Sequence, residues 1–210
     1  MLNENVKRNY EEWLEKVDDE ELKKELESVS DDEDAINERF YCELEFGTGG
    51  LRGKLRAGTN GMNVCTVSRA AAGLAEYLKE TVKGEKSVAV AYDSRNKSRE
   101  FAFLSAAVFS SAGIKTYVFD ELVPTPVLSF AVRYLKTSAG VVVTASHNPK
   151  EYNGYKVYNA KGCQITEEAA LAITEKIENA SYFGKYKPNN SLITVLDNRV
   201  MNAFLSEVEK

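Results

Sequence analysis

Three short apolar runs, separated by longer helical segments, constrain the fold more than any other feature of the sequence. They occupy residues 87–92, 114–119 and 139–144, and turn residues lie at their ends. Apolar runs of this length between turns are typical of buried strands. Because strands that alternate with helices usually pair in parallel, the pattern predicts a three-layer α/β/α domain around a mixed, mainly parallel sheet.

The other elements are predicted from periodicity and from capping residues. Apolar side chains spaced three and four apart indicate a helix through residues 67–78. Ser98 and Thr166 are typical N-caps and are expected to begin two further helices. Residues 154–158 have the composition of a last strand, and 197–210 form an amphipathic helix whose apolar side is expected to lack a partner.

The first 45 residues are an acidic flank. They hold 17 acidic and 6 basic side chains, whereas residues 46–210 hold 15 and 21. Helical spacing of Tyr10, Trp13, Leu14 and Val17, and a capping-box sequence at Ser30–Glu33, predict helices here. We therefore expect residues 1–45 to be a helical extension whose charges form a solvated outer face.

The basic body of the chain favours a small anionic ligand. Its lysines and arginines are dispersed and do not form the blocks that are typical of nucleic-acid binding. No apolar run of eighteen residues and no secretion signal is present, so we expect a cytoplasmic protein without a membrane or nucleic-acid partner. Cys42, Cys65 and Cys163 show no metal or disulfide spacing and are expected to be buried or half-buried thiols.

A long glycine-rich segment follows the acidic flank. Residues 46–62 contain six glycines in seventeen positions, a composition that predicts an extended loop. The segment Gly47–Gly53 lacks the lysine and the spacing of a nucleotide P-loop. Another kind of anion-binding loop and a purely structural turn both remain open.

Ser146 follows the third apolar run by two residues, where the loops of an open α/β sheet commonly bind ligands. His147, the only histidine, is adjacent, but no nucleophile-elbow sequence surrounds the serine, which argues against a serine hydrolase. Phosphoryl transfer would need an exposed hydroxyl and nearby cations, which Arg52, Lys150 and Lys156 could supply. Serine, asparagine and proline are also ordinary turn residues, so the residues alone leave both interpretations open.

The turn Asp93–Arg95 precedes the helix that Ser98 is expected to cap. An aspartate and an arginine in this position usually hold each other and the helix start. We interpret this turn as mainly structural support for the candidate site.

Two motifs together resemble the α-D-phosphohexomutases. Thr144–Pro149 with Asn153, Gly154 and Lys156 is similar to the phosphoserine loop of that family, and Phe46–Gly53 is similar to its N-terminal loop. The continuation Ala57–Asn63 resembles the phosphoglucomutase-2-like branch of bacterial phosphoglucomutases and phosphomannomutases. The likeness extends over about residues 40 to 180.

The resemblance implies an enzyme that interconverts hexose 1-phosphates and hexose 6-phosphates through a phosphoserine and a hexose bisphosphate. It implies Mg²⁺ as cofactor, with the phosphate on Ser146 as one ligand. The implied catalytic residues are Ser146, Lys156, Arg52 and His147, and the implied phosphate-binding residues are Thr48, Gly49, Arg52, Asn148 and Lys156. Lys156 is the better candidate for acid–base help, because an ammonium among cations loses its proton more readily than a guanidinium.

The family's Asp-Gly-Asp-x-Asp-Arg metal loop, its sugar-binding loop and its final phosphate-binding loop are absent from the sequence. We therefore expect an N-terminal piece of a longer mutase, inactive alone, whose partners include the missing C-terminal domains. The expected division is 1–45 as extension, 46–190 as the phosphoserine domain and 191–210 as a linker helix. A phosphopentomutase, a phosphoglucosamine mutase and a non-catalytic anion-binding module are the alternatives.

Overall fold

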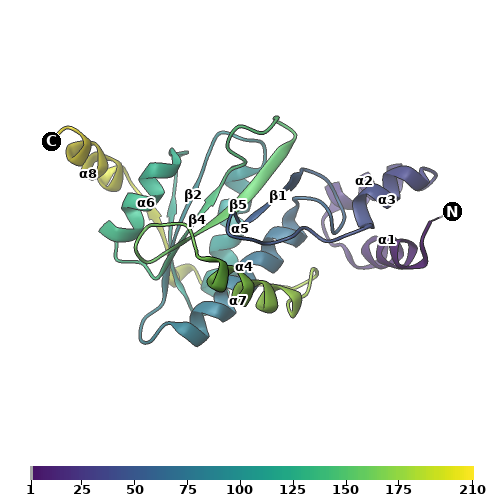
Figure 1. Ribbon diagram of the computed structural model, residues 1–210, viewed down its shortest axis with the longest axis horizontal. Coiled ribbons are helices and arrows are strands. Elements are labelled where there is room, and N and C mark those ends of the chain that lie inside the picture. The colour runs from purple at the N-terminus through teal and green to yellow at the C-terminus, as the bar shows by residue number, and fades with distance from the viewer. Residues whose placement is uncertain (1) are drawn as a thin grey trace.

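A six-stranded mixed sheet forms the centre of the molecule in the computed structural model, which describes residues 2–210 (Figure 1). The spatial order of the strands is β1-β5-β4-β2-β3-β6. Strands β4, β2, β3 and β6 are parallel, while β5 is antiparallel to both β4 and β1. The strands are β1 (Leu51–Lys54), β2 (Ser87–Tyr92), β3 (Lys115–Phe119), β4 (Ala139–Val143), β5 (Tyr152–Asn159) and β6 (Ile193–Leu196).

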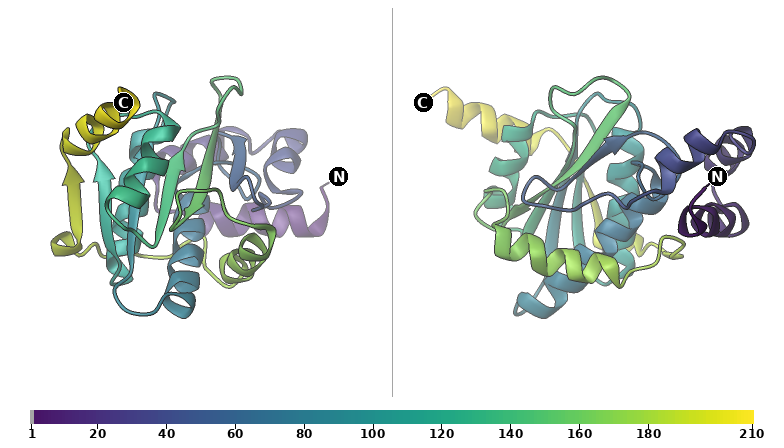
Figure 2. Two further views of the ribbon diagram at one scale, coloured as in Figure 1. Left: turned by 60° about the vertical axis from the view of Figure 1, so that its left-hand side comes forward. Right: turned by 45° about the vertical axis from the view of Figure 1, so that its right-hand side comes forward.

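Helices cover both faces of the sheet, so the predicted three-layer α/β/α architecture is confirmed (Figure 2). Successive residues of β2 point to opposite faces: Val88 and Val90 enter one apolar cluster, and Ala89 and Ala91 enter another. The first cluster packs against α4 (Val64–Thr81), α5 (Ser98–Ser111) and α7 (Glu167–Glu178), and the second against α6 (Thr125–Tyr134) and α8 (Arg199–Val208).

Three short helices form the N-terminal extension, which projects from one end of the sheet domain (Figure 1). They are α1 (Glu4–Lys16), α2 (Glu20–Ser28) and α3 (Glu33–Phe40). They share a separate apolar cluster around Trp13, whose ring lies 5.3 Å and 5.6 Å from the rings of Tyr182 and Phe183. Those two rings follow α7, so aromatic packing joins the extension to the domain.

Two of the predicted N-capping residues are wrong, although α5 begins at Ser98 as expected. The side chain that caps α3 is that of Asp32, which accepts a hydrogen bond from the Ala35 amide at 2.9 Å, and not that of Ser30. Helix α5 begins after Lys97, and the Ser98 hydroxyl donates to the Asp93 carboxylate at 2.9 Å. Thr166 caps α7 as predicted. Capping depends on local dihedral angles that several neighbouring polar residues can satisfy.

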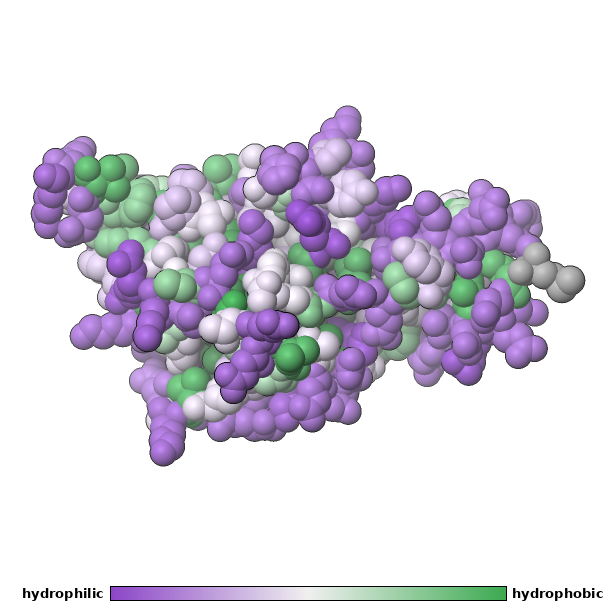
Figure 3. All heavy atoms as spheres, viewed as in Figure 1, coloured by the Kyte–Doolittle hydropathy of each residue, from purple (hydrophilic) through white to green (hydrophobic). Residues whose placement is uncertain are grey.

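The chain beyond residue 190 contributes more to the domain than the sequence predicted. Strand β6 pairs with β3 at the edge of the sheet, and the Phe204 ring of α8 lies 5.7 Å from the Phe130 ring of α6. The first half of α8 is therefore partnered, contrary to our prediction, with Val200 buried. Leu205 and Val208 are exposed, and apolar atoms gather over α8 in the space-filling view (Figure 3). A domain boundary near residue 190 stays a prediction.

The cysteine prediction is wrong for two of the three thiols. Cys42 and Cys163 are exposed, and only Cys65 is buried. Burial raises the pKa of the Cys65 thiol to about 12, and the negative charges of Asp19 and Asp18 act in the same direction. None of the described helices, within residues 2–210, has the length and apolar character needed to cross a membrane.

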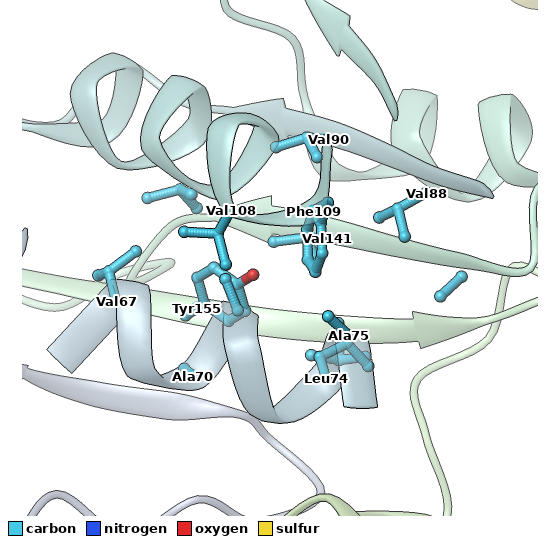
Figure 4. Packing of buried hydrophobic residues seen from close by; sticks show 14 of the residues in the cluster. Val67, Ala70, Leu74, Ala75, Val88, Val90, Val108, Phe109, Val141 and Tyr155 are labelled. Carbon is cyan, nitrogen blue, oxygen red and sulfur yellow. The ribbon is translucent and has the colours of Figure 1, made fainter. Parts of the chain in front are cut away.

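Tyr155 of β5 lies in the largest apolar cluster, between α4 and the sheet (Figure 4). Its hydroxyl is buried and has no hydrogen-bond partner among the described residues. The nearby Ser105 hydroxyl donates its own proton to the Phe101 carbonyl at 2.7 Å. Burial raises the pKa of the Tyr155 phenol, and the Ser105 side chain opposes this shift by a smaller amount.

Replacing Tyr155 by Phe removes the unpartnered hydroxyl and keeps the ring. We expect the free energy of unfolding to stay the same or to rise by up to about 1 kcal/mol, because a buried unsatisfied polar group is destabilising. Tyr155→Ala should lower it by about 3–5 kcal/mol through the cavity that it leaves. Urea unfolding of the three proteins measures both effects, and a Phe variant clearly less stable than the parent would contradict this view of the hydroxyl.

Candidate functional site

Ser146 lies on an exposed loop that leaves the carboxyl end of β4. Thr144 and Ala145 are buried, whereas Ser146 and His147 are exposed. The Ser146 backbone is left-handed, with φ of 57°, and its amide donates to the Thr144 hydroxyl at 2.9 Å. Such a conformation is uncommon for a serine and is found mostly at turns and functional sites. The loop therefore presents the Ser146 hydroxyl to solvent in a fixed conformation.

The loop consists of two consecutive turns. The Asn148 amide donates to the Ala145 carbonyl at 3.1 Å, and the Tyr152 amide donates to the Pro149 carbonyl at 3.0 Å, after which β5 begins. Both turns are closed by main-chain hydrogen bonds, as in ordinary β-turns. The path from Ala145 to Tyr152 is consequently defined by the backbone and not by side-chain packing alone.

Among the described residues, His147 is the only side chain within hydrogen-bond range of the Ser146 hydroxyl. Its Nδ1 lies 3.4 Å from Ser146 Oγ, a long contact. Within residues 2–210 the imidazole has no carboxylate partner to orient it, as a serine-hydrolase triad would require. The geometry thus agrees with the sequence in giving no support to nucleophilic hydrolysis.

Arg52 and Lys156 come from the two antiparallel strands beside the loop. Arg52 pairs with Gly154 across β1 and β5, and Lys156 lies two residues further along β5, so both side chains are on the same face of the sheet. Arg52 Nη1 donates to Asn148 Oδ1 at 3.1 Å, which places the guanidinium against the Ser146 loop. Lys156 is half-buried, and its ammonium has no ion pair among the described residues.

Thr48 and Gly49 form the exposed tip of a turn that precedes β1. Gly47 and Gly50 close this turn through two main-chain hydrogen bonds, of 3.3 Å and 2.8 Å. The turn does not form a hydrogen bond to the Ser146 loop anywhere in the part of the chain that the structure describes. The structure thus brings His147 to Ser146 and Arg52 to Asn148 of the same loop, and it places Thr48 and Gly49 in the turn before the start of β1.

Two glycines allow these segments to approach one another. A Cβ at Gly154 would lie 2.6 Å from the Thr144 carbonyl oxygen and 2.9 Å from that of Leu51. Gly50 has φ of +77°, and a Cβ there would overlap the Tyr155 carbonyl. The 46–62 segment is therefore not only a loop, as predicted, because residues 51–54 form a strand against β5.

Arg95 contacts the Ser146 loop more extensively than any residue that the motifs singled out. Its guanidinium donates to four loop carbonyls, and the Asp93 carboxylate lies 3.4 Å from its Nε. The sequence indicated Asp93–Arg95 as a supporting turn, but not which segment it supports. The feature that could have indicated this contact is the position of the Asp93–Arg95 turn at the carboxyl end of β2, because β2 lies next to β4 in the sheet.

The described residues alone do not fit a magnesium site. They contain no group of three or more His, Cys, Asp or Glu side chains placed to hold a metal ion. The Asp93 carboxylate near the loop is already used by the Arg95 amide and the Ser98 hydroxyl, at 3.0 Å and 2.9 Å. Magnesium needs several oxygen ligands in octahedral geometry, and a phosphate on Ser146 would supply only part of that set.

Proteins with similar sequences are sugar-phosphate mutases by name. A phosphoglucomutase of Staphylococcus haemolyticus (strain JCSC1435) is 48% identical over 140 residues, which cover 67% of this chain and 25% of that protein. A "Probable phosphoribomutase" of Schizosaccharomyces pombe is 46% identical over 171 residues, 80% of this chain and 29% of that one. A candidate phosphomannomutase of Thermus thermophilus has a similar crystal structure, with a TM-score of 0.70 at 32% identity, over 80% of this chain and 36% of that chain.

The fold and the site define an α/β/α domain that exposes a serine on the loop after β4, with Arg52 bound to the same loop. Residues 43–183 match the family described as phosphoglucomutase/phosphomannomutase, alpha/beta/alpha domain I. The chain belongs to this family, which confirms the resemblance of its motifs. It spans about a quarter to a third of the length of the curated relatives that it matches.

The close approach at Gly50 can be tested by adding a single methyl group. We expect Gly50→Ala to lower the free energy of unfolding by about 2 kcal/mol or more, because the left-handed backbone and the Tyr155 carbonyl both oppose it. Gly49→Ala is the matched control, since a Cβ there meets no heavy atom within 4 Å. It should change stability by less than about 0.5 kcal/mol. Equal effects in chemical denaturation would contradict the contact between this turn and β5.

Proposed function

We propose that this chain is the phosphoserine-carrying domain of a mutase that interconverts hexose 1-phosphates and hexose 6-phosphates through a hexose bisphosphate. The observation that carries the proposal is the exposed Ser146 hydroxyl, held in a left-handed turn beside Arg52. Family membership supports it, because relatives are named phosphoglucomutases. A surface serine with no basic neighbour would not support this chemistry.

In the proposed reaction Ser146 transfers its phosphoryl group to a sugar hydroxyl. The bond between phosphorus and Ser146 Oγ breaks, a bond from phosphorus to the sugar oxygen forms, the sugar hydroxyl loses its proton to a base, and the departing Ser146 oxygen takes up a proton to become a hydroxyl. The reverse transfer, from the other position of the bisphosphate, restores the phosphoserine. Catalysis of phosphoryl transfer depends mainly on positioning and on stabilising the charge of the three equatorial oxygens.

Arg52 and Lys156 have separate catalytic roles in this proposal. The Arg52 guanidinium stabilises the transferring negative charge, while Lys156 acts in proton transfer. The absence of an ion-paired acid beside Lys156 among residues 2–210 is consistent with a role in binding an anion. Asn148 orients Arg52, and His147 assists at the Ser146 hydroxyl; Thr48 and Gly49 contribute to phosphate binding.

Magnesium and further domains complete the proposed enzyme. Bound Mg²⁺ would neutralise charge on the transferring phosphoryl group, with the phosphate on Ser146 as one ligand and the others from outside this chain. Since the chain spans only a quarter to a third of its relatives, we propose that residues 1–45 are an extension, 46–190 the phosphoserine domain and 191–210 a link to a second domain. The 210-residue chain alone is then inactive.

A second candidate function is the same phosphoryl transfer on a different sugar phosphate. The Schizosaccharomyces pombe relative, 46% identical, is named a phosphoribomutase, which favours a pentose phosphate as the alternative substrate. A hexosamine phosphate is a further possibility within the same reaction class. A non-catalytic anion-binding module is the alternative from another class, and it would carry no covalent phosphate.

The kinetic test uses the full-length polypeptide, with glucose 1-phosphate or ribose 1-phosphate and Mg²⁺. We expect Ser146→Ala to reduce kcat/KM by about 10³-fold or more, because the phosphoryl carrier is removed. Lys156→Met should reduce kcat by about 10²–10⁴-fold. Ser30→Ala changes another exposed serine, in the turn between α2 and α3, and is the matched control, expected to retain activity.

The two variants test the role of Ser146 and the role of Lys156 separately. A Ser146→Ala enzyme with normal turnover would remove Ser146 from the mechanism. A Lys156→Met enzyme with normal turnover would remove only the proposed acid–base role, and the ratio of the two sugar rates identifies the substrate.

A further inference from the structure

All four terminal N–H groups of Arg95 are used by the Ser146 loop. Nη2 donates to the Ser146 and Asn148 carbonyls at 2.5 Å and 2.8 Å, and Nη1 donates to the Pro149 and Tyr152 carbonyls at 3.0 Å and 3.1 Å. The acceptors are 51 to 57 residues away in the sequence. A planar guanidinium can reach four separated oxygens, whereas a lysine ammonium has three donors at one point.

The Arg95 guanidinium is itself held in place by burial and by the Asp93 carboxylate. Its side chain is only 13% exposed, and Asp93 Oδ2 lies 3.4 Å from Nε. The other Asp93 oxygen accepts from the Ser98 hydroxyl at 2.9 Å, and Asn153 Nδ2 donates to Ser98 Oγ at 3.0 Å. Since Asn153 belongs to β5, the network joins the β2 turn, the start of α5 and the far end of the Ser146 loop.

The orientation of these carbonyls determines where the loop amides point. In a trans peptide the C=O and the following N–H point in opposite directions. The carbonyls of Ser146 and Pro149 face Arg95, so the amides of His147 and Lys150 face the exposed side of the loop. Neither amide donates to another group within residues 2–210. Outward amides in a turn with a left-handed residue are a recurrent anion-binding arrangement.

We propose that Arg95 is a positioning residue for the phosphate on Ser146. It turns the loop carbonyls inward, where they cannot repel the phosphate, and so presents the His147 and Lys150 amides to the phosphate oxygens. Arg95 acts through the loop and does not touch the phosphate, and the carboxylate of Asp93 balances its charge. The inference rests on the proposed function of Ser146.

The test uses the 210-residue chain with phosphoserine placed at position 146 by genetic encoding. Backbone NMR compares the phosphorylated and unphosphorylated forms. We expect phosphorylation to shift the His147 and Lys150 amide protons downfield and to slow their hydrogen exchange by about 10-fold or more, as charge-assisted hydrogen bonds form. In Arg95→Lys both effects should be lost while the spectrum of the sheet and of α4 is retained.

Arg99→Lys is the matched control. Arg99 is the next arginine in the chain, 63% exposed, and its Nη2 lies 3.6 Å from Asp120. This variant should respond to phosphorylation like the parent. Should Arg95→Lys not fold, Asp93→Asn keeps the side-chain shape and removes the charge beside Nε, and at least half of the exchange effect should be lost.

Two results would overturn the proposal. One is a parent protein whose His147 and Lys150 amides do not respond to the phosphate. The other is a folded Arg95→Lys protein, or in its place Asp93→Asn, that responds as fully as the parent. Because phosphoserine is installed independently of catalysis, failure of the proposed function would appear in the Ser146→Ala kinetics and not in these spectra.

Discussion

The site depends on the close approach of three main-chain segments around Gly154. The carbonyl oxygens of Thr144 and Leu51 lie where a side chain at this position would have to be, on either side of β5. No residue larger than glycine fits between them without displacing backbone. This contact brings together the end of β4, which carries the Ser146 loop, and β1, which carries Arg52. The antiparallel strands β1 and β5 at the edge of the sheet thereby carry the basic residues Arg52 and Lys156, while the loop after β4 carries the serine.

The positive side chains around Gly154 differ in whether an acidic side chain balances their charge. The charge of Arg95 is balanced by Asp93, and its donors are used by loop carbonyls. Lys156, in contrast, has no ion-paired acid among residues 2–210, and Arg52 is bound to a neutral amide. A paired arginine organises the backbone, whereas unpaired cations attract an anion. The structure thus holds two kinds of positive side chain beside the Ser146 loop: Arg95, whose charge is paired, and Arg52 and Lys156, which have no acidic partner among residues 2–210.

Much of the fold could be predicted because its longer strands and helices are indicated by residues that are close together in the sequence. The apolar runs became β2, β3 and β4, the periodic segment at 67–78 became part of α4, and the cap at Thr166 begins α7. The short strands β1 and β6 were not predicted, since each has four residues, lies at a sheet edge and has no long apolar run.

The candidate site, like the fold, could be predicted from the sequence only in part. Its motif identified Ser146, Lys156 and Arg52, but the four acceptors of Arg95 lie 51 to 57 positions from it in the sequence. Long-range hydrogen bonds of a single arginine have no periodic signature in one sequence. The contacts of Arg95 with the Ser146 loop therefore emerged only from the three-dimensional structure.

The central claim is that Ser146 carries a phosphoryl group covalently, and mass spectrometry of the freshly purified full-length polypeptide tests it most directly. The account predicts that a fraction of the molecules carry one phosphate, that peptide mapping places it on Ser146, and that a hexose bisphosphate increases the fraction. A polypeptide that remains unmodified at Ser146 after exposure to the bisphosphate and Mg²⁺, while still converting the sugar phosphate, would contradict it.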